Sequence, residues 1–250
     1  MRFFVVLRRD TAVVLLLCLM VLPGTFLLFR SLETIPSLHR TPGTFYMVNT
    51  QDKVIALTFD DGPDPLYTGQ ILDILKKEKV KATFFVLGQG VAENPGLVAR
   101  IHKEGHEIGN HSFTHDYRQR KLVNEIISTD KAVFAAAGVH TRFYRPPGGG
   151  VTRMQLDQIK LNGHIVALWS LDSRDWLNPG SKQIVRSVTR AAFPGAIILL
   201  HDGGEKRDQT VTALEPIIEA LRAQDYRFVT LSELYALARD DDTLPTGPGH

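Results

Sequence analysis

Residues 54–63 read VIALTFDDGP, an apolar run that leads into two adjacent aspartates and a Gly-Pro turn. A continuous apolar run of this length predicts a β-strand that is covered on both faces. Adjacent aspartates most often belong to a solvated turn or a helix cap, but Asp60 and Asp61 directly follow the predicted strand. Successive side chains there face different ways, so one carboxylate can bind a metal ion while the other accepts a proton.

Similar apolar runs recur along the chain and alternate with helical patterns. The seven predicted strands cover residues 54–59, 82–87, 107–109, 141–144, 165–171, 196–200 and 227–231. Between them, apolar residues recur at helical spacing, for example at Leu214, Ile217, Ile218 and Leu221. Strands that alternate with helices form βαβ units, so we predict an α/β fold with parallel strands. An open doubly wound sheet and a closed barrel both satisfy this pattern.

Ionisable residues follow five of these strands at their C-terminal ends. These residues are Asp60 and Asp61, His111 and His115, Arg145, Asp172 and Asp175, and His201 and Asp202. The C-terminal ends of parallel strands share one edge of the sheet, and α/β folds bind and react at that edge. The five clusters therefore predict one active site.

His111 and His115 are four residues apart, so both rings can bind one cation from a helical turn or a tight loop. The pair alone is a weak signal, because histidine pairs are common on protein surfaces. With one carboxylate from Asp60 or Asp61 it would form a three-ligand site that leaves a position for water. A divalent cation there would acidify that water and polarise a carbonyl oxygen.

The remaining residues at this edge have structural alternatives. His201 follows a fully apolar stretch and could be a histidine at the edge of the core that is satisfied by backbone groups. Arg145 precedes two prolines and could form a structural salt bridge. Trp176 could belong to the core or offer an apolar platform to the face of a sugar.

The composition excludes several classes of protein. The chain has 250 residues, of which 44% are hydrophobic and 22% are charged, as is typical of a globular protein. Its net charge of +2 is too balanced to indicate a nucleic-acid partner, and no protein partner can be inferred. The single cysteine, Cys18, excludes a disulfide framework within the chain, CxxC redox chemistry and a cysteine-based zinc site.

The beginning of the sequence predicts a membrane anchor. Arg2, Arg8 and Arg9 precede an uncharged apolar stretch at residues 12–29, which would form a helix of about 27 Å. We predict a single N-terminal transmembrane helix, with a cleaved signal peptide as the alternative. The arginines favour a cytoplasmic N-terminus, so the rest of the chain would be extracellular, anchored in the cell membrane by a single pass or secreted after cleavage.

The predicted organisation has four parts. Residues 1–30 form the membrane anchor or signal peptide, and residues 31–50 form a linker. Residues 51–238 form the catalytic domain, and residues 239–250 form a disordered tail without an apolar face.

Five short motifs occur in an order that resembles the polysaccharide deacetylases, carbohydrate esterase family 4, also called the NodB-homology domain. They are TFDDGP at 58–63, HSFTH at 111–115, RPP at 145–147, DSRDW at 172–176 and LLHD at 199–202. The resemblance covers roughly residues 51–238, and five ordered motifs are far more specific than any one of them. It implies an irregular (β/α)7-type barrel of parallel strands.

The same resemblance implies roles for residues. Asp61, His111 and His115 would hold a divalent metal ion, zinc first, with Co²⁺, Ni²⁺ or Mn²⁺ as alternatives. Asp60 would be the general base, held in place by Arg145.

The family resemblance also assigns the proton donor and the substrate contacts. His201 would be the general acid, oriented by Asp175. A backbone N–H in the Pro147–Gly148 stretch would stabilise the oxyanion, and Trp176 and Leu200 would line the pocket for the acetyl methyl group. Many family members have tyrosine where this chain has Gly148, the first of three glycines, which predicts a more mobile and more open groove.

The implied activity is metal-dependent hydrolysis of the N-acetyl group from N-acetylglucosamine units of an extracellular polysaccharide, with peptidoglycan first. Chitin-type oligomers and a non-sugar amide are alternative substrates on the same scaffold. A catalytically silent wall-binding module is a further alternative. It is disfavoured because Asp60, Asp61, His111, His115 and His201 are all present.

Overall fold

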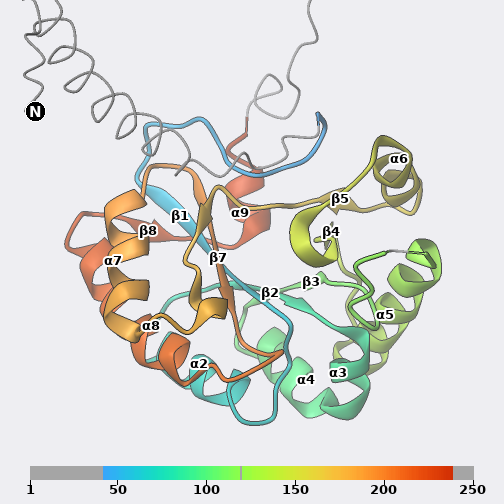
Figure 1. Cartoon of the computed structure of the whole chain (residues 1–250), viewed down its shortest axis with the longest axis horizontal. Coiled ribbons are helices and arrows are strands. Elements are labelled where there is room, and N and C mark those ends of the chain that lie inside the picture. Colours follow the sequence, from blue (N-terminus) through green and yellow to red (C-terminus); the bar gives the residue numbers. More distant parts are fainter. Residues whose placement is uncertain (1–41, 119, 239–250) are drawn as a thin grey trace, which may run out of the picture. The chain divides into compact units, whose positions relative to one another are not determined.

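A computed structural model describes residues 42–118 and 120–238, which lie in one compact unit (Figure 1). The predicted anchor at residues 1–30, most of the linker and the predicted tail at residues 239–250 lie outside the described residues. Within the described residues, every helix is too short or too polar to cross a membrane.

Strands and helices alternate along the described chain. The strands are β1 Val54–Asp60, β2 Thr83–Val86, β3 Glu107–Asn110, β4 Phe143–Tyr144, β5 Ile165–Val166, β6 Leu171–Asp172, β7 Ala196–His201 and β8 Arg227–Phe228. The helices are α2 Thr68–Lys77, α3 Gly88–Glu93, α4 Pro95–Lys103, α5 Leu122–Ala137, α6 Arg153–Leu161, α7 Ser181–Ala191, α8 Asp208–Arg222 and α9 Leu231–Tyr235. Two short 3₁₀ helices follow β4 and β6, at Pro147–Gly149 and Asp175–Leu177.

All the strands join one parallel sheet. Its order is β5-β4-β3-β2-β1-β7-β6, and β8 pairs with the start of β1. β7 pairs along one edge of β1. On the other edge, β8 pairs with the start of β1 and β2 pairs with its end. In the described part of the chain β5 and β6 form no ladder with each other. The predicted parallel α/β fold is confirmed, as a curled sheet that is open at this point rather than a closed barrel.

The predicted strand at residues 165–171 is in fact two short strands, β5 and β6. The residues between them give backbone groups to other partners. The carbonyl oxygens of Ala167 and Leu168 accept hydrogen bonds from the Arg145 side chain, and the Leu168 N–H donates to the Phe45 carbonyl. The apolar run is therefore interrupted as a strand where two of its carbonyl groups bind the buried guanidinium of Arg145.

The predicted strand at residues 227–231 is also shorter than expected, because α9 begins at Leu231. Thr230 and Glu233 cap this helix reciprocally. The Glu233 N–H donates to Thr230 Oγ1, and the Thr230 N–H donates to a carboxylate oxygen of Glu233. This capping box is a helix-start signal in the sequence itself.

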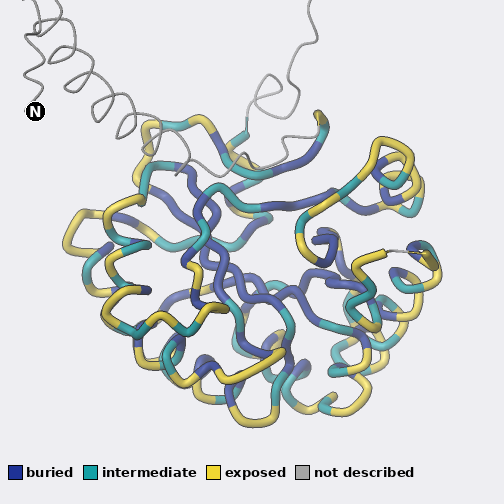
Figure 2. The backbone as a smooth tube through the Cα atoms, in the orientation of Figure 1, coloured by how far each residue is buried: buried dark blue, intermediate teal, exposed yellow. Residues whose placement is uncertain are grey.

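Strand β1 lies at the centre of the core, and all seven of its residues are buried. Ile55, Leu57 and Phe59 pack into the larger hydrophobic cluster, which includes residues of α2, α4, α7 and α8. Val54 and Ala56 face the opposite way, into a smaller cluster that includes residues of α9. Figure 1 shows helices along the outer side of the curved sheet, and Figure 2 shows the strands buried beneath exposed helix faces.

Gly195 precedes β7, and its backbone allows no side chain. Its φ is +81°, and an added Cβ would lie 1.9 Å from the Val48 carbonyl oxygen. We expect Gly195→Ala to lower the free energy of unfolding by about 3 kcal/mol or more, since a clash with backbone adds to the left-handed strain. Urea unfolding followed by tryptophan fluorescence measures this loss.

Gly163→Ala is the matched control for this prediction. Gly163 has a φ of +82°, but an added Cβ would meet nothing within 4 Å. Its substitution should cost only the strain, about 1–2 kcal/mol. Equal losses for the two variants would contradict the close approach of Gly195 to Val48.

Candidate active site

The side chains predicted to be functional gather where the strands end. Asp60 and His201 are the last residues of β1 and β7, and they are partners in the parallel register. His111 directly follows the last residue of β3. These residues line one pocket of about 530 Å³ in the described part of the chain, together with Asp61 and His115.

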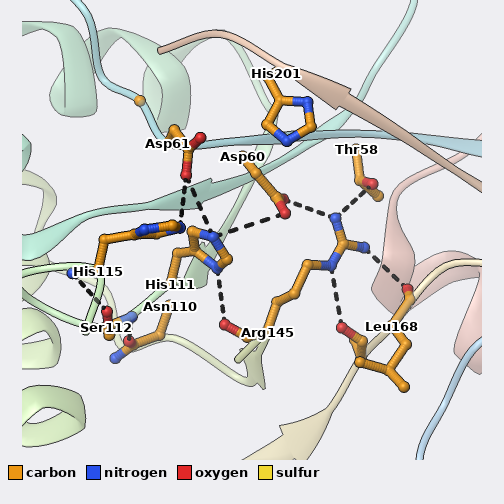
Figure 3. Close-up of polar contacts among 12 residues, drawn as sticks. Thr58, Asp60, Asp61, Asn110, His111, Ser112, His115, Arg145, Leu168 and His201 are labelled. Atoms are coloured by element: carbon orange, nitrogen blue, oxygen red, sulfur yellow. Dashed lines mark hydrogen bonds and ion pairs between the residues drawn. The ribbon is translucent and has the colours of Figure 1, made fainter. Parts of the chain in front are cut away.

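Asp61, His111 and His115 form a compact cluster of possible metal ligands. Asp61 Oδ1 lies 3.2 Å from His115 Nε2 and 3.4 Å from His111 Nε2 (Figure 3). One ligand atom from each residue lies within 4.8 Å of the others. The structure thus brings together the three residues for which the sequence predicted metal binding.

A hydrogen bond fixes which nitrogen of His111 faces the cluster. His111 Nδ1 lies 2.8 Å from the Arg145 carbonyl oxygen, which only accepts hydrogen bonds. Nδ1 therefore carries the hydrogen, and in the neutral ring Nε2 presents a lone pair toward Asp61. Burial lowers the pKa of His111, but the charges of Asp60 and Asp61 raise it more.

The three residues fit a divalent cation. Asp61 Oδ1 is buried, and no described group makes a regular hydrogen bond to it. Its distances to the two imidazole nitrogens, 3.2 and 3.4 Å, suit a tetrahedral ion, whose bonds of about 2.0–2.1 Å separate ligand atoms by about 3.3 Å. Burial and the His111 charge lower the pKa of His115, which favours the neutral, metal-binding form of the ring. Burial raises the pKa of Asp61, but the three nearby histidines lower it to about 2, so it is a carboxylate.

The loop that carries His115 is held by groups on either side. The His115 N–H donates to Ser112 Oγ, and the Ser112 N–H donates to Asn110 Oδ1. Glu125 of α5 accepts hydrogen bonds from the backbone N–H groups of residues 113 and 114. His115 and Ser112 have φ values of +59° and +71°, so these contacts hold a strained backbone.

Asp60 is fixed by a buried ion pair with Arg145. Arg145 Nη1 donates to Asp60 Oδ1 at 2.7 Å, and both side chains are buried. The guanidinium also donates to Thr58 Oγ1 and to the carbonyls of Ala167 and Leu168 (Figure 3). Asp60 Oδ2 lies 3.8 Å from His111 Nε2, so the second carboxylate oxygen faces the metal cluster.

His201 forms a second charged pair, with Asp175. His201 Nδ1 and the His201 backbone N–H both donate to the Asp175 carboxylate, each at 2.8 Å, and Thr210 Oγ1 donates to it as well. Burial lowers the pKa of His201, but Asp175 raises it to about 9. The ring is therefore protonated at neutral pH, and it lies beside Asp60 and Asp61 (Figure 3).

Asp202 is a buried carboxyl to which the sequence assigned no role. It accepts hydrogen bonds from the Gly62 N–H and from Thr68 Oγ1, so it ties the turn after Asp61 to α2. Burial, together with the charges of Asp60 and Asp61, raises its pKa to about 7. The feature of the sequence that pointed to Asp202 was its position directly after His201.

Among the predicted substrate contacts, Gly148 and Trp176 line the pocket, and Leu200 does not. Leu200 is fully buried in the larger core cluster, and Leu199 lines the pocket instead. The reason is strand alternation: neighbouring side chains of β7 face opposite sides of the sheet. The pocket also includes residues that the sequence analysis missed, namely Leu87, Tyr117, Trp169, Gly204, Glu205 and Arg207.

Comparisons with known proteins agree with this geometry. The family model described as polysaccharide deacetylase matches residues 47–167. A peptidoglycan-N-acetylglucosamine deacetylase of Bacillus cereus is 48% identical over 193 residues, which cover 75% of this chain and 90% of that protein. A chitooligosaccharide deacetylase of Bradyrhizobium is 40% identical over 197 residues, with 72% and 90% covered. The solved Bc1960 peptidoglycan N-acetylglucosamine deacetylase is 35% identical, with a TM-score of 0.76 over 82% of this chain and 99% of that one.

The cluster geometry makes a prediction about metal affinity. We expect His115→Ala to weaken zinc binding by about 100-fold or more, because it removes one of three ligands. Equilibrium dialysis against Zn²⁺ measures the affinity. His201→Ala should keep the affinity of the unmodified chain, since His201 is paired with Asp175. Loss of metal in that control would show that the ligand set is wrong.

The His201–Asp175 pair makes a prediction about proton binding. The pKa of His201 should be about 9, and in Asp175→Asn it should fall toward the ordinary value of 6.5, since only the charges of Asp60 and Asp61 then oppose the effect of burial. Imidazole NMR titration of the metal-free protein measures both values. Thr210→Val removes only one hydrogen bond to Asp175 and should give a smaller drop. A pKa that stays near 9 in Asp175→Asn would contradict this account.

Proposed function

Because this chain belongs to the polysaccharide deacetylase family, we propose that it hydrolyses the N-acetyl group of N-acetylglucosamine residues in peptidoglycan. The observation that carries the proposal is one pocket in which a metal-ligand cluster lies beside an oriented carboxylate, Asp60, and a protonated imidazole, His201. Amide hydrolysis needs a base to activate water and an acid to protonate the leaving amine. The named activities of the relatives support the same reaction.

Zinc is the metal that we propose for this site. Two imidazoles and one carboxylate form a donor set that suits Zn²⁺ and leaves a position open for water or substrate. When bound, the ion supplies a Lewis acid that acidifies water and polarises the carbonyl oxygen of the acetyl group. Co²⁺, Ni²⁺ and Mn²⁺ accept similar ligands and are the alternatives.

Asp60 accepts the proton of the attacking water. Its Oδ1 is occupied by Arg145, so Oδ2, which faces the cluster, is the basic atom. Arg145 supplies the opposite charge that pairs with the Asp60 side chain in this buried site. The water oxygen then adds to the acetyl carbon, and the Gly148 N–H is the backbone donor that we assign to the resulting oxyanion.

His201 completes the reaction from the strand next to that of Asp60. Its protonated ring gives a proton to the amide nitrogen as the carbon–nitrogen bond breaks, which releases acetate and a free amine. Asp175 stabilises the protonated ring and holds it by Nδ1, so the opposite nitrogen is the donor. Trp176 and Leu199 line the pocket around the acetyl group.

Chitin-type oligomers are the second candidate substrate. They contain the same N-acetylglucosamine unit, and a chitooligosaccharide deacetylase is among the similar proteins. Both substrates require the same chemistry, so the relative rates decide between them. A non-sugar amide substrate or a silent wall-binding module is favoured only if neither glycan releases acetate.

The proposed location is the outer side of the cell membrane. It rests on the arginines at positions 2, 8 and 9 and on the uncharged apolar stretch at residues 12–29. Peptidoglycan would be accessible to a domain anchored there. A secreted form after cleavage is the alternative.

The test of the proposed function is acetate release from two glycans in parallel. The full-length chain in detergent is stripped of metal with a chelator and supplied with Zn²⁺. We expect metal-dependent acetate release from peptidoglycan at a higher rate than from N-acetylglucosamine oligomers. The reverse order would assign the chitin-type substrate, and no acetate with metal bound would reject glycan deacetylation.

Asp60→Asn tests the assigned base. The substitution should lower kcat by about 1,000-fold while the bound zinc stays unchanged, because it removes a proton acceptor and keeps the three ligands. Acetate release and metal content are measured on the same sample. Asp157→Asn, an exposed carboxylate of α6 paired with Arg153, is the control and should be fully active. Full activity of Asp60→Asn would remove Asp60 from the mechanism.

A further inference from the structure

Tyr117 lies at the mouth of the pocket, and no motif in the sequence assigns it a role. Its side chain is 67% exposed, and it lines the same pocket as the metal cluster. One contact is to His115, whose ring meets the tyrosine ring edge to face at a centroid distance of 4.6 Å. The ring is thus placed beside a metal ligand but open to a ligand from solvent.

The other contact of Tyr117 is to Gly148. A Cβ added to Gly148 would lie 3.1 Å from two carbon atoms of the tyrosine ring. Gly148 also has a φ of +68°, which disfavours any other residue. The ring of Tyr117 therefore occupies the space over Gly148, and the groove is not open there as the glycine run predicted.

Exposed aromatic side chains are rare in the described residues and concentrate at this pocket. Tyr117, Phe134 and Trp176 are the three such residues that the structure describes. Tyr117 and Trp176 line the pocket, whereas Phe134 stacks on His140 of the loop after α5. An exposed aromatic ring costs little entropy to place and offers an apolar face with a polar tip, which suits the C–H face of a pyranose ring.

We propose that Tyr117 is a substrate-binding residue whose ring stacks on a sugar of the glycan chain, on the His115 and Gly148 side of the pocket. The proposal rests on the proposed function, since it names a contact of that same site. Tyr117 belongs to the loop after His115. Its ring occupies the space over Gly148 that a side chain at position 148 would fill.

A merely structural role for Tyr117 predicts a different outcome. His115 is already held through its backbone by Ser112, and its Nε2 faces Asp61. If the ring of Tyr117 served only to hold His115, its removal would weaken metal binding. If the ring binds sugar, its removal should raise KM and leave the metal in place.

The first experiment compares Tyr117→Ala and Tyr117→Phe in the full-length, zinc-loaded chain, with the N-acetylglucosamine hexamer as substrate. We expect Tyr117→Ala to raise KM about tenfold, with kcat within about threefold and zinc affinity unchanged. Tyr117→Phe keeps the aromatic face and should match the unmodified chain. Phe134→Ala removes another exposed aromatic ring, which lies outside the pocket, and should also match it. An unchanged KM in Tyr117→Ala, or a tenfold weaker zinc affinity, would overturn the proposal.

A binding measurement separates this proposal from the proposed function. Calorimetry with the hexamer is done in the Asp60→Asn background, so that turnover does not interfere. Tyr117→Ala in this background should weaken binding about tenfold, and equal affinities or no binding at all would overturn the role of Tyr117. This result stands whether or not the unmodified chain releases acetate, whereas failure of acetate release rejects only the deacetylase function.

Gly148→Ala tests the contact between the two residues. The new Cβ would lie 3.1 Å from two ring carbons, so the Tyr117 ring must shift by a few tenths of an ångström, and KM should rise in the unmodified background. In the Tyr117→Ala background the ring is absent. The increase in KM caused by Gly148→Ala should therefore be smaller there, by a factor of about three or more. Equal effects in both backgrounds would show that the ring does not occupy the space over Gly148.

Discussion

The buried ion pair between Asp60 and Arg145 constrains the site and the sheet together. Both charges are removed from water, so the guanidinium requires a full set of acceptors. Thr58 and Asp60 come from β1, and the remaining acceptors are the carbonyls of Ala167 and Leu168. Those carbonyls lie between β5 and β6 and are diverted from strand pairing. The sheet is thus open at the place where it binds Arg145. The same guanidinium orients the Asp60 carboxylate.

The two pairs, Asp60–Arg145 and His201–Asp175, place a carboxyl group and an imidazole side by side, each held by a buried partner. Arg145 holds Asp60 by Oδ1, whereas Asp175 holds His201 by Nδ1 and raises its pKa. Both supporting residues are fully buried, so water does not screen their charges. One pocket can therefore hold a base and an acid at the same pH, which is what hydrolysis of an amide requires.

The sequence predicted the parallel α/β fold and the convergence of five motifs, because strand ends and ionisable residues are local features. It did not predict that residues 165–171 break into two strands, since the cause is the side chain of Arg145, which is remote in sequence. We predicted Leu200 in the pocket instead of Leu199, because the motif does not show which side chains of β7 face the pocket. That depends on how the strand is oriented within the sheet. Tyr117 belongs to none of the motifs, and its proposed role follows from its exposed place in the pocket beside His115 and Gly148.

Asp60 and His201 are separated by most of the chain but are direct partners in the register of β1 and β7. Their spacing is therefore set by a ladder of backbone hydrogen bonds, one strand apart, rather than by flexible loops. This pairing also orders events during synthesis. A growing chain that carries every metal ligand still lacks its acid until β7 has emerged from the ribosome and paired with β1.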